Sequence, residues 1–226
     1  MIRAVTFDAD GTLWDFEQAM FQAQTLVLAD LQARMPAAAS LTVDRLLAIR
    51  EEVAAVLEPQ GASLIQIRLA AFERTLESIG APDPAHAAHL NSLYMQHRMT
   101  ATRLYDDTLP ALDALAGLTL GIISNGNTDP DRCGLSGRFQ FVLFADQHGA
   151  GASKPDRRMF DVALGLAACD PSEVLHVGDS LPNDVAAPQQ LGIRSVWLNR
   201  DGIPNTTGIM PDAEITSLLE LPALLR

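Results

Sequence analysis

The alternation of apolar and polar positions changes character along the 226 residues of the chain. Residues 2–7 form a short, β-rich apolar run that predicts a strand. Residues 16–102 are rich in Ala, Leu and Gln and carry almost no strand signal. Within them, apolar residues recur at helical spacing at Met20, Ala23, Val27, Leu31 and Met35. We therefore expect helices throughout residues 16–102.

Breaks in this segment divide it into four predicted helices. The first ends before Pro36. The other three are expected over residues 43–57, 63–79 and 84–102. Four consecutive helices indicate a separate helical unit rather than part of a sheet.

From residue 103 onward, predicted strands alternate with predicted helices. Strands are expected at 118–124, 141–144, 174–177 and 195–198, and helices at 110–116, 155–168, 184–191 and 217–225. This alternation is typical of a parallel sheet that is covered on both faces. We assign residues 2–7 to the same sheet. The predicted fold class is therefore α/β, with a Rossmann-like parallel core of residues 1–15 and 103–226 and an inserted all-helical domain of residues 16–102.

Polar side chains follow the carboxyl ends of the predicted strands, where ligands bind in open α/β sheets. They are Asp8, Asp10 and Thr12; Ser124, Asn125 and Gly126; Asp146, His148 and Lys154; and Asp179 and Asp184. Neighbouring carboxylates raise one another's pKa, so this edge needs a compensating cation. Oxygen ligands suit Mg²⁺, and no spacing of His and Cys favours zinc.

The basic residues single out one position. The chain has 16 Lys and Arg residues, and Lys154 is the only lysine. A source that favours Arg codons explains most of this bias. The exception then suggests that a compact ammonium is needed at position 154, although a surface lysine without a function is the alternative.

The same residues allow phosphoryl chemistry. Of Asp8 and Asp10, one can be an ionised nucleophile and the other an acid that protonates a leaving group. Ser124 and the backbone N–H groups around Asn125 and Gly126 can hold phosphate oxygens. The Lys154 ammonium can neutralise the remaining charge.

The pattern resembles the haloacid dehalogenase (HAD) superfamily, in its phosphatase branch. The matching pieces are DADGT (8–12), SNG (124–126), SKP (153–155) and GDSLPND (178–184), in family order. The helical insertion stands where the family has a C1 cap domain. Two features depart from the family pattern. Ala186-Ala187-Pro188 replaces a usual Gly-Ala, where we still expect a helix because Pro188 lies near its first turn. The loop GAGAS (149–153) is longer than the usual spacer.

The resemblance also implies a role for each matching residue. Asp8 would be the nucleophile that forms an aspartyl-phosphate, and Asp10 the general acid–base whose backbone carbonyl also meets Mg²⁺. Asp179 would bind the metal, with Asp184 bound directly or next to a ligand. Thr12 and Ser124 would steady the phosphoryl group, and Lys154 would orient Asp8 and the phosphate.

The predicted function is a Mg²⁺-dependent phosphomonoester hydrolase that acts on a small phosphorylated metabolite. Similar dehalogenases carry an aromatic residue where this chain has Asp10, which favours phosphatase over 2-haloacid dehalogenase. Related phosphonate hydrolases use a cap lysine, and residues 16–102 contain none. A phosphomutase or a non-enzymatic binding module remains as an alternative. Neither the substrate nor the oligomeric state can be deduced from the sequence.

Composition narrows the partners and the compartment. A formal net charge of −12 argues against nucleic acid. No apolar run reaches the roughly 18 residues of a membrane span, and no signal peptide is expected. We interpret Cys133 and Cys169 as free thiols, which favours a cytoplasmic protein.

A few other side chains invite an interpretation. Trp14 is expected at the site entrance or half-buried under the cap. Gln66 and Arg68 follow the turn at Gly61, and a solvated helix face is favoured over a substrate contact. The five histidines lack ligand spacing and are expected to be structural or exposed.

Overall fold

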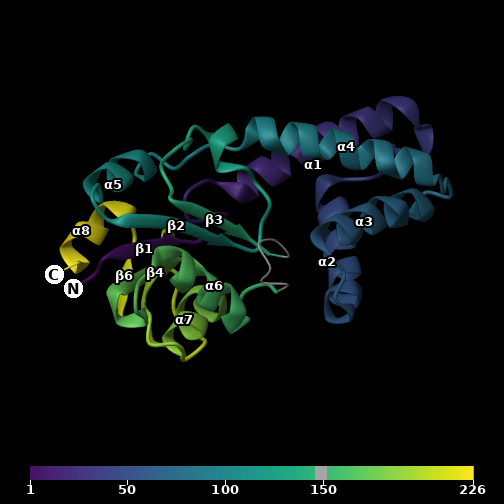
Figure 1. Cartoon of the computed structure of the whole chain (residues 1–226). Helices are drawn as coiled ribbons and strands as arrows, with labels where there is room; N and C mark the ends of the chain where they lie inside the picture. The colour runs from purple at the N-terminus through teal and green to yellow at the C-terminus, as the bar shows by residue number, and fades with distance from the viewer. Residues whose placement is uncertain (146–151, 226) are drawn as a thin grey trace. The chain divides into compact units, whose positions relative to one another are not determined.

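The computed structural model describes residues 1–145 and 152–225 (Figure 1). The chain divides into two compact units. The core unit comprises Met1–Phe16 and Arg103–Arg226, and the helical unit comprises Glu17–Thr102. Each unit buries its own apolar clusters. Asp146, His148 and residues 149–151 of the predicted loop lie outside the described residues.

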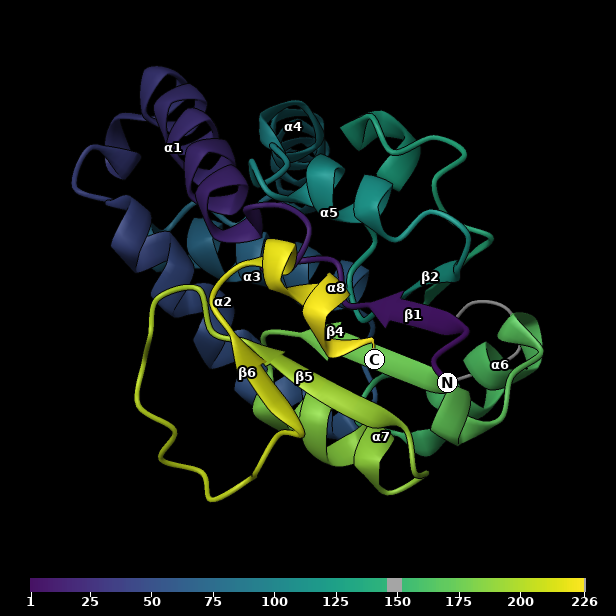
Figure 2. The same ribbon diagram turned by 90° about the vertical axis from the view of Figure 1, so that its left-hand side faces the viewer.

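Within the described residues, the core unit contains a six-stranded parallel sheet with the order β3-β2-β1-β4-β5-β6 (Figures 1 and 2). The strands are β1 (Ala4–Phe7), β2 (Thr119–Ser124), β3 (Phe141–Phe144), β4 (Val174–Gly178), β5 (Arg194–Leu198) and β6 (Ala213–Ile215). Phe7 of β1 pairs with Ile122 of β2 and Val177 of β4. The carboxyl end of β4 therefore lies one residue beyond that of β1, and the end of β2 two residues beyond it, so the segments after the three strands start near one another.

Helices cover both faces of this sheet. Alternate residues of each strand point to opposite sides, and apolar side chains on both sides need to be buried. Val5 and Phe7 belong to the cluster that includes α5 (Thr108–Ala114) and α8 (Leu221–Leu224). Ala4 belongs to the cluster on the other face, with α6 (Arg157–Ala167) and α7 (Ala187–Gln189). The α/β fold class and its parallel sheet, with a helical insertion after the first strand, are confirmed.

The segment after β4 differs from the helix predicted over residues 184–191. A π-helix spans Leu181–Ala186 and leads into α7, which has only three residues. Pro188 has no N–H to complete a regular bond to the carbonyl four residues earlier, so the chain there does not form an uninterrupted α-helix. Short 3₁₀ turns occupy Pro36–Ala38, Glu58–Gln60, Pro130–Cys133, Pro171–Glu173 and Leu218–Glu220.

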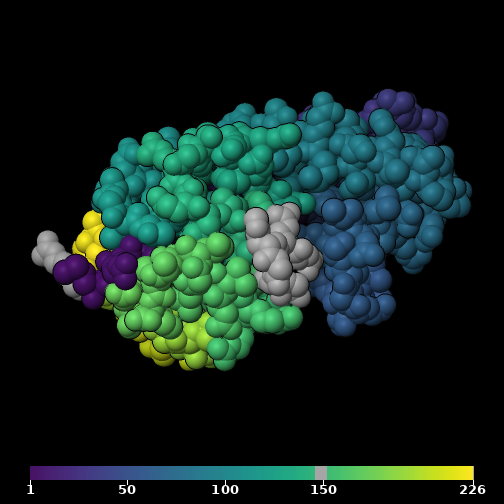
Figure 3. Space-filling view, in the orientation of Figure 1, coloured from purple at the N-terminus to yellow at the C-terminus, as the bar shows by residue number. Residues whose placement is uncertain are grey.

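The helical unit contains the four predicted helices. They are α1 (Phe16–Arg34), α2 (Val43–Leu57), α3 (Leu64–Ser78) and α4 (Pro84–Ala101). Local signals fix their starts: Thr42, Ser63 and Asp83 each accept a backbone N–H of the helix that follows. Helices α2 and α3 lie next to each other, and their blue surfaces are continuous in Figure 3. In the described part of the chain, no helix is long and apolar enough to cross a membrane.

Gln66 and Arg68, both on α3, differ in their exposure to solvent. Gln66 completes a capping box with Ser63, which accounts for its exposed position. Arg68 is only 8% exposed, so the prediction of a solvated face is wrong for this residue.

Candidate active site

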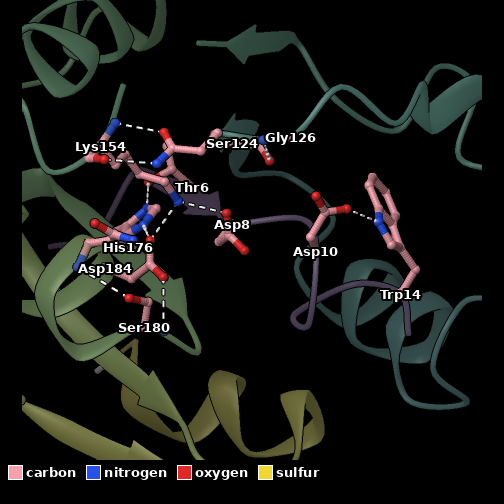
Figure 4. Close-up of polar contacts among 12 residues, drawn as sticks. Thr6, Asp8, Asp10, Trp14, Ser124, Gly126, Lys154, His176, Ser180 and Asp184 are labelled. Atoms are coloured by element: carbon pink, nitrogen blue, oxygen red, sulfur yellow. Dashed lines mark hydrogen bonds and ion pairs between the residues drawn. The ribbon is translucent and has the colours of Figure 1, made fainter. Parts of the chain in front are cut away.

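A buried ion network joins the segments that follow β1 and β4 to the segment before α6. Lys154 Nζ donates to Asp8 Oδ1 and to Asp184 Oδ1, each at 2.6 Å (Figure 4). Lys154 is 4% exposed and Asp184 is 1% exposed. The only lysine of the chain is therefore not a surface residue. Its ammonium is shared between two carboxylates that are far apart in the sequence.

A second group of contacts holds the carboxylate of Asp184. His176 Nε2 lies 3.2 Å from Asp184 Oδ1, and His176 Nδ1 lies 2.8 Å from Thr6 Oγ1. Burial lowers the pKa of His176, so the ring is neutral at pH 7. Since a carboxylate only accepts, Nε2 donates to Asp184 and Nδ1 accepts from the Thr6 hydroxyl. The Ser180 N–H holds the other oxygen, Oδ2, at 3.0 Å.

The contact of His176 with Asp184 was not predicted from the sequence. It lies in the middle of the otherwise apolar β4 and is fully buried. A polar ring in a strand buried on both faces needs a partner, and this was the available signal.

Three carboxylates gather around this network. Oxygens of Asp8, Asp179 and Asp184 lie within 4.8 Å of one another. Burial raises the pKa of Asp8 well above its usual value, and the charges of Asp184 and Asp179 add to this against the opposing charge of Lys154. Asp179 is exposed, yet partial desolvation and the charge of Asp184 raise its pKa to about 6. The site therefore carries more negative charge than its one ammonium compensates.

Two glycines allow the carboxylates to come this close. Gly11 has φ +81°, and a Cβ added there would lie 2.5 Å from Asp179 Oδ2. A Cβ at Gly178 would overlap the carboxyl group of Asp184. Any side chain at Gly11 would displace the Asp179 carboxylate, and any side chain at Gly178 would displace that of Asp184. Glycine at both positions therefore allows the carboxylates to lie close together.

Asp10 lies apart from this cluster and faces the end of β2. Trp14 Nε1 donates to Asp10 Oδ1 at 2.6 Å (Figure 4). A Cβ at Gly126 would overlap Asp10 Oδ2 and would lie 3.2 Å from Ser124 Oγ. Trp14 is fully buried, so the expected half-buried position is wrong. Its indole instead orients the second acid of the first motif.

The predicted phosphate-binding segment also holds Lys154 in place. The side-chain amide of Asn125 accepts from Lys154 N at 2.7 Å and donates to Lys154 O at 2.8 Å. Gly126 N donates to Ser124 Oγ at 2.9 Å. The side chain of Asn125 therefore ties the segment after β2 to the lysine.

Thr12 is placed differently from the other predicted site residues. It is fully buried, and within the described residues its hydroxyl has no hydrogen-bond partner. Its carbonyl accepts from Arg200 Nη2 at 2.8 Å. Arg200 also pairs with Asp107 at 2.9 Å and stacks over the Tyr105 ring, 3.9 Å from its centroid. These contacts brace the turn after β1.

An acidic cluster with a single lysine, at the carboxyl edge of a parallel sheet, is the arrangement of a known class of hydrolases. The chain belongs to the haloacid dehalogenase-like hydrolase family, whose model matches residues 2–192. Among curated relatives, the 5-amino-6-(5-phospho-D-ribitylamino)uracil phosphatase YigB of Escherichia coli (strain K12) is 30% identical, over 99% of this chain and 96% of its own length.

Two solved structures resemble the whole chain. The 2-haloacid dehalogenase from Pseudomonas syringae pv. tomato DC3000 has a TM-score of 0.81 and 34% identity, covering 100% of this chain and 98% of its own. The HAD-hydrolase YfnB from Bacillus subtilis, solved bound to magnesium, has a TM-score of 0.80 and 25% identity, covering 100% and 99%. The relatives of this chain therefore include both phosphatases and dehalogenases.

Proposed function

We propose that the chain is a Mg²⁺-dependent phosphomonoester hydrolase that acts on a small phosphorylated metabolite. One observation carries the proposal. Lys154 bridges Asp8 and Asp184 at 2.6 Å, and Asp179 brings a third carboxylate within 4.8 Å. This arrangement supplies a nucleophile, a fixed positive charge and oxygen ligands at one place. The curated relative YigB, which this chain matches over 96% of its length, is a phosphatase, and this supports a phosphatase activity for the chain.

Asp8 and Asp10 divide the chemistry between them. A carboxylate oxygen of Asp8 attacks phosphorus, the bond from phosphorus to the leaving oxygen breaks, and an aspartyl-phosphate forms. Asp10 gives a proton to the leaving oxygen and then takes one from the water that hydrolyses the intermediate. Because Trp14 holds Asp10 through Oδ1, we expect the transferable proton on Oδ2, the oxygen nearest Gly126.

The donor set fits Mg²⁺. Three carboxylates within 4.8 Å are hard oxygen ligands. Burial raises the pKa of Asp8 and of Asp179, and the charges of the neighbouring carboxylates raise both further. We infer that Asp8, Asp179 and the backbone carbonyl of Asp10 hold the metal. When bound, the ion supplies positive charge that keeps Asp8 ionised and offsets the phosphate charge.

Asp184 has a different part in this proposal. Its two oxygens already accept from Lys154, His176 and the Ser180 N–H. We infer that it positions Lys154 and contributes charge to the metal site from next to the ligands. Burial would raise the pKa of Asp184, but Lys154 and His176 outweigh it and hold the pKa at about 2, so this residue stays ionised.

The phosphoryl group is proposed to lie between Lys154 and the segment after β2. Ser124, with the backbone N–H groups of Asn125 and Gly126, would hold its oxygens, and Thr12 would steady the turn that carries Asp8 and Asp10. The helical unit is proposed as the cap domain, and a small cytoplasmic metabolite as the substrate. Nucleic acid and membranes are not proposed as partners.

Hydrolytic dehalogenation is the second candidate, because a 34% identical chain of the same fold is named a 2-haloacid dehalogenase. In that reaction Asp8 would displace a halide from carbon. A halide leaves without a proton, so the reaction has no need of an acid at position 10. The Asp10 carboxyl held by Trp14 therefore favours the phosphatase.

One assay pair separates the two candidates. The purified protein is given an aryl phosphate with Mg²⁺ or with excess chelator, and separately 2-chloropropionate. Mg²⁺-dependent phosphate release, absent in Asp8→Asn, supports the phosphatase. Halide release without phosphate release would favour the dehalogenase. Phosphate release by Asp8→Asn at the wild-type rate would refute the proposed nucleophile.

A further inference from the structure

The interior of the helical unit holds a small polar cavity. All its walls come from α1 to α4 and include Gln24, Arg50, Arg68, Thr75 and Tyr94. The cavity offers about 20 Å³ to the centre of a water-sized sphere. One water needs roughly 10–15 Å³ on the same measure, so the cavity admits one small polar group.

Arg68 is the more deeply buried of the two arginines that line this cavity, and it has no counter-ion among the described residues. Its Nη1 contacts the sulfur of Met95, and its guanidinium lies 5.5 Å from the centroid of the Tyr94 ring. Its Nε has no hydrogen-bond partner. Among the described residues, no carboxylate forms an ion pair with Arg68. A buried charge without a partner is costly, and a thioether and an aromatic ring compensate it only weakly.

The surroundings of Arg68 are positive rather than negative. Burial, and then the charges of Arg98 and Arg50, lower the pKa of Arg68 to about 10. Arg50 pairs with Glu51 at 2.7 Å, but the Glu51 side chain is 72% exposed, so this carboxylate lies at the surface. The cavity is thus a site of uncompensated positive charge.

The neutral residues of the cavity offer further hydrogen bonds. Gln24 is 4% exposed, and its Oε1 has no hydrogen-bond partner. Because the oxygen and nitrogen of a side-chain amide exchange places by a half-turn, Gln24 can present an N–H to an anion. Thr75, by contrast, already donates to the Ala71 carbonyl at 2.8 Å.

We propose that this cavity binds a carboxylate group of a small ligand, with Arg68 as its ion-pair partner. A planar carboxylate matches the fork of a guanidinium and needs little depth. A tetrahedral phosphate with four oxygens is larger than the space. The carboxylate belongs either to the phosphorylated substrate or to a separate metabolite. The first source rests on the proposed function, whereas carboxylate binding itself does not.

Direct titration tests the site. Sodium acetate and sodium glycolate are titrated into wild type, Arg68→Gln and Arg74→Gln, with sodium chloride at equal ionic strength as the reference. Arg74 is a matched control, because it lies on the same helix with a side chain that is 61% exposed. We expect wild type and Arg74→Gln to bind alike and Arg68→Gln to bind at least about tenfold more weakly.

The titration can overturn the proposal in two ways. Equal affinity in all three proteins places any binding elsewhere, and an equal response to chloride shows a non-specific anion effect. If Arg68→Gln does not fold, Arg50→Gln replaces it, with the same expected direction. Wild type that does not bind either carboxylate also refutes the site.

A second arm identifies the source of the carboxylate. Asp8→Asn, which is expected not to turn over, is titrated with glycolate and with phosphoglycolate. If the substrate supplies the carboxylate, phosphoglycolate binds at least about tenfold tighter than glycolate, and Arg68→Gln added to Asp8→Asn weakens both. If a separate metabolite supplies it, Arg68→Gln weakens the binding of glycolate only, because phosphoglycolate is then held through its phosphate at the active site. Because the first arm measures carboxylate binding alone, failure of the phosphatase proposal leaves that arm intact.

Discussion

Lys154 in the core unit and Arg68 in the helical unit are both buried cations, 4% and 8% exposed, in opposite surroundings. Lys154 lies 2.6 Å from each of two carboxylates. Arg68 lies against a sulfur and an aromatic ring, with further arginines nearby. The acidic cluster of the core unit is left with excess negative charge, and the cavity of the helical unit with excess positive charge.

The difference matters because burial of a charge is tolerated when partners repay the lost hydration. In the core unit, Asp8, Asp179 and Asp184 outnumber Lys154, and a divalent cation would restore the balance. In the helical unit an anion would do so. Each imbalance therefore points to a ligand of the opposite sign.

The largest effect is expected where shape matters as much as charge. Lys154→Arg keeps the charge, but a planar guanidinium does not reproduce two separate 2.6 Å contacts to Asp8 and Asp184. We expect kcat/KM with an aryl phosphate to fall by roughly 10²–10³-fold. Arg158→Lys, with a side chain that is 59% exposed, is the control and should keep its rate. A Lys154→Arg enzyme with an unchanged rate would contradict the proposed role.

The free energy of unfolding of variants that lack the Lys154 or the Arg68 charge tests this comparison. Lys154→Met leaves Asp8 and Asp184 buried without their cation, and we expect a loss of about 3–5 kcal/mol in the free energy of unfolding. Arg68→Met removes a charge that has no counter-ion, so its effect should stay within about 1 kcal/mol or be stabilising. Urea denaturation at pH 7 measures both. Equal losses in the two variants would show that Arg68 is compensated within the chain.

Metal binding should stabilise the core unit. Mg²⁺ at about 100 times its Kd is expected to raise stability by about 2.7 kcal/mol, and hence to raise the melting temperature. Asp179→Ala should reduce this shift, whereas removal of an exposed carboxylate by Asp161→Asn should not. Full phosphatase activity in excess chelator would contradict a metal requirement.

A smaller effect is expected at Asp107, which pairs with Arg200. Burial would raise the pKa of Asp107, but the hydrogen bonds from Arg200, Ser217 and Leu218 outweigh it and hold the pKa below 3.8. A depressed folded pKa gives stability that is fully present above pH 3.8 and is lost as the pH falls through the folded pKa.

Denaturation of wild type and Asp107→Asn between pH 7 and pH 2 isolates this contribution. The advantage of wild type should shrink as the pH drops below about 4, because the Asp107 carboxylate then becomes protonated. A difference between the two proteins that is independent of pH would show that the pair adds no electrostatic stability.

Strong periodicity and capping residues made most of the fold predictable. The predicted helix Val43–Leu57 matches α2, because Thr42 provides a cap and the apolar spacing is regular. The strand β6 was missed because three residues give no pattern to read. The π-helix after β4 was missed because the effect of Pro188 depends on how the backbone before it turns.

The convergence of Asp8, Lys154, Asp179 and Asp184 was expected from their positions after parallel strands. The burial of Arg68 was not expected, although it lies four residues before the buried Phe72, on the same stripe of α3. That spacing was a signal that this arginine faces inward. The partners of Arg68, by contrast, depend on how four helices pack and cannot be read from the pattern of α3 alone.

In the proposed mechanism, Asp8 accepts a phosphoryl group from the substrate. The most direct measurement is a single-turnover reaction with a phosphate-labelled substrate and Mg²⁺, quenched in acid, followed by peptide mass spectrometry. We expect a transient label on Asp8 in wild type and no label in Asp8→Asn. Turnover that proceeds while Asp8 stays unlabelled at every time point, or a label on another residue, would contradict this mechanism.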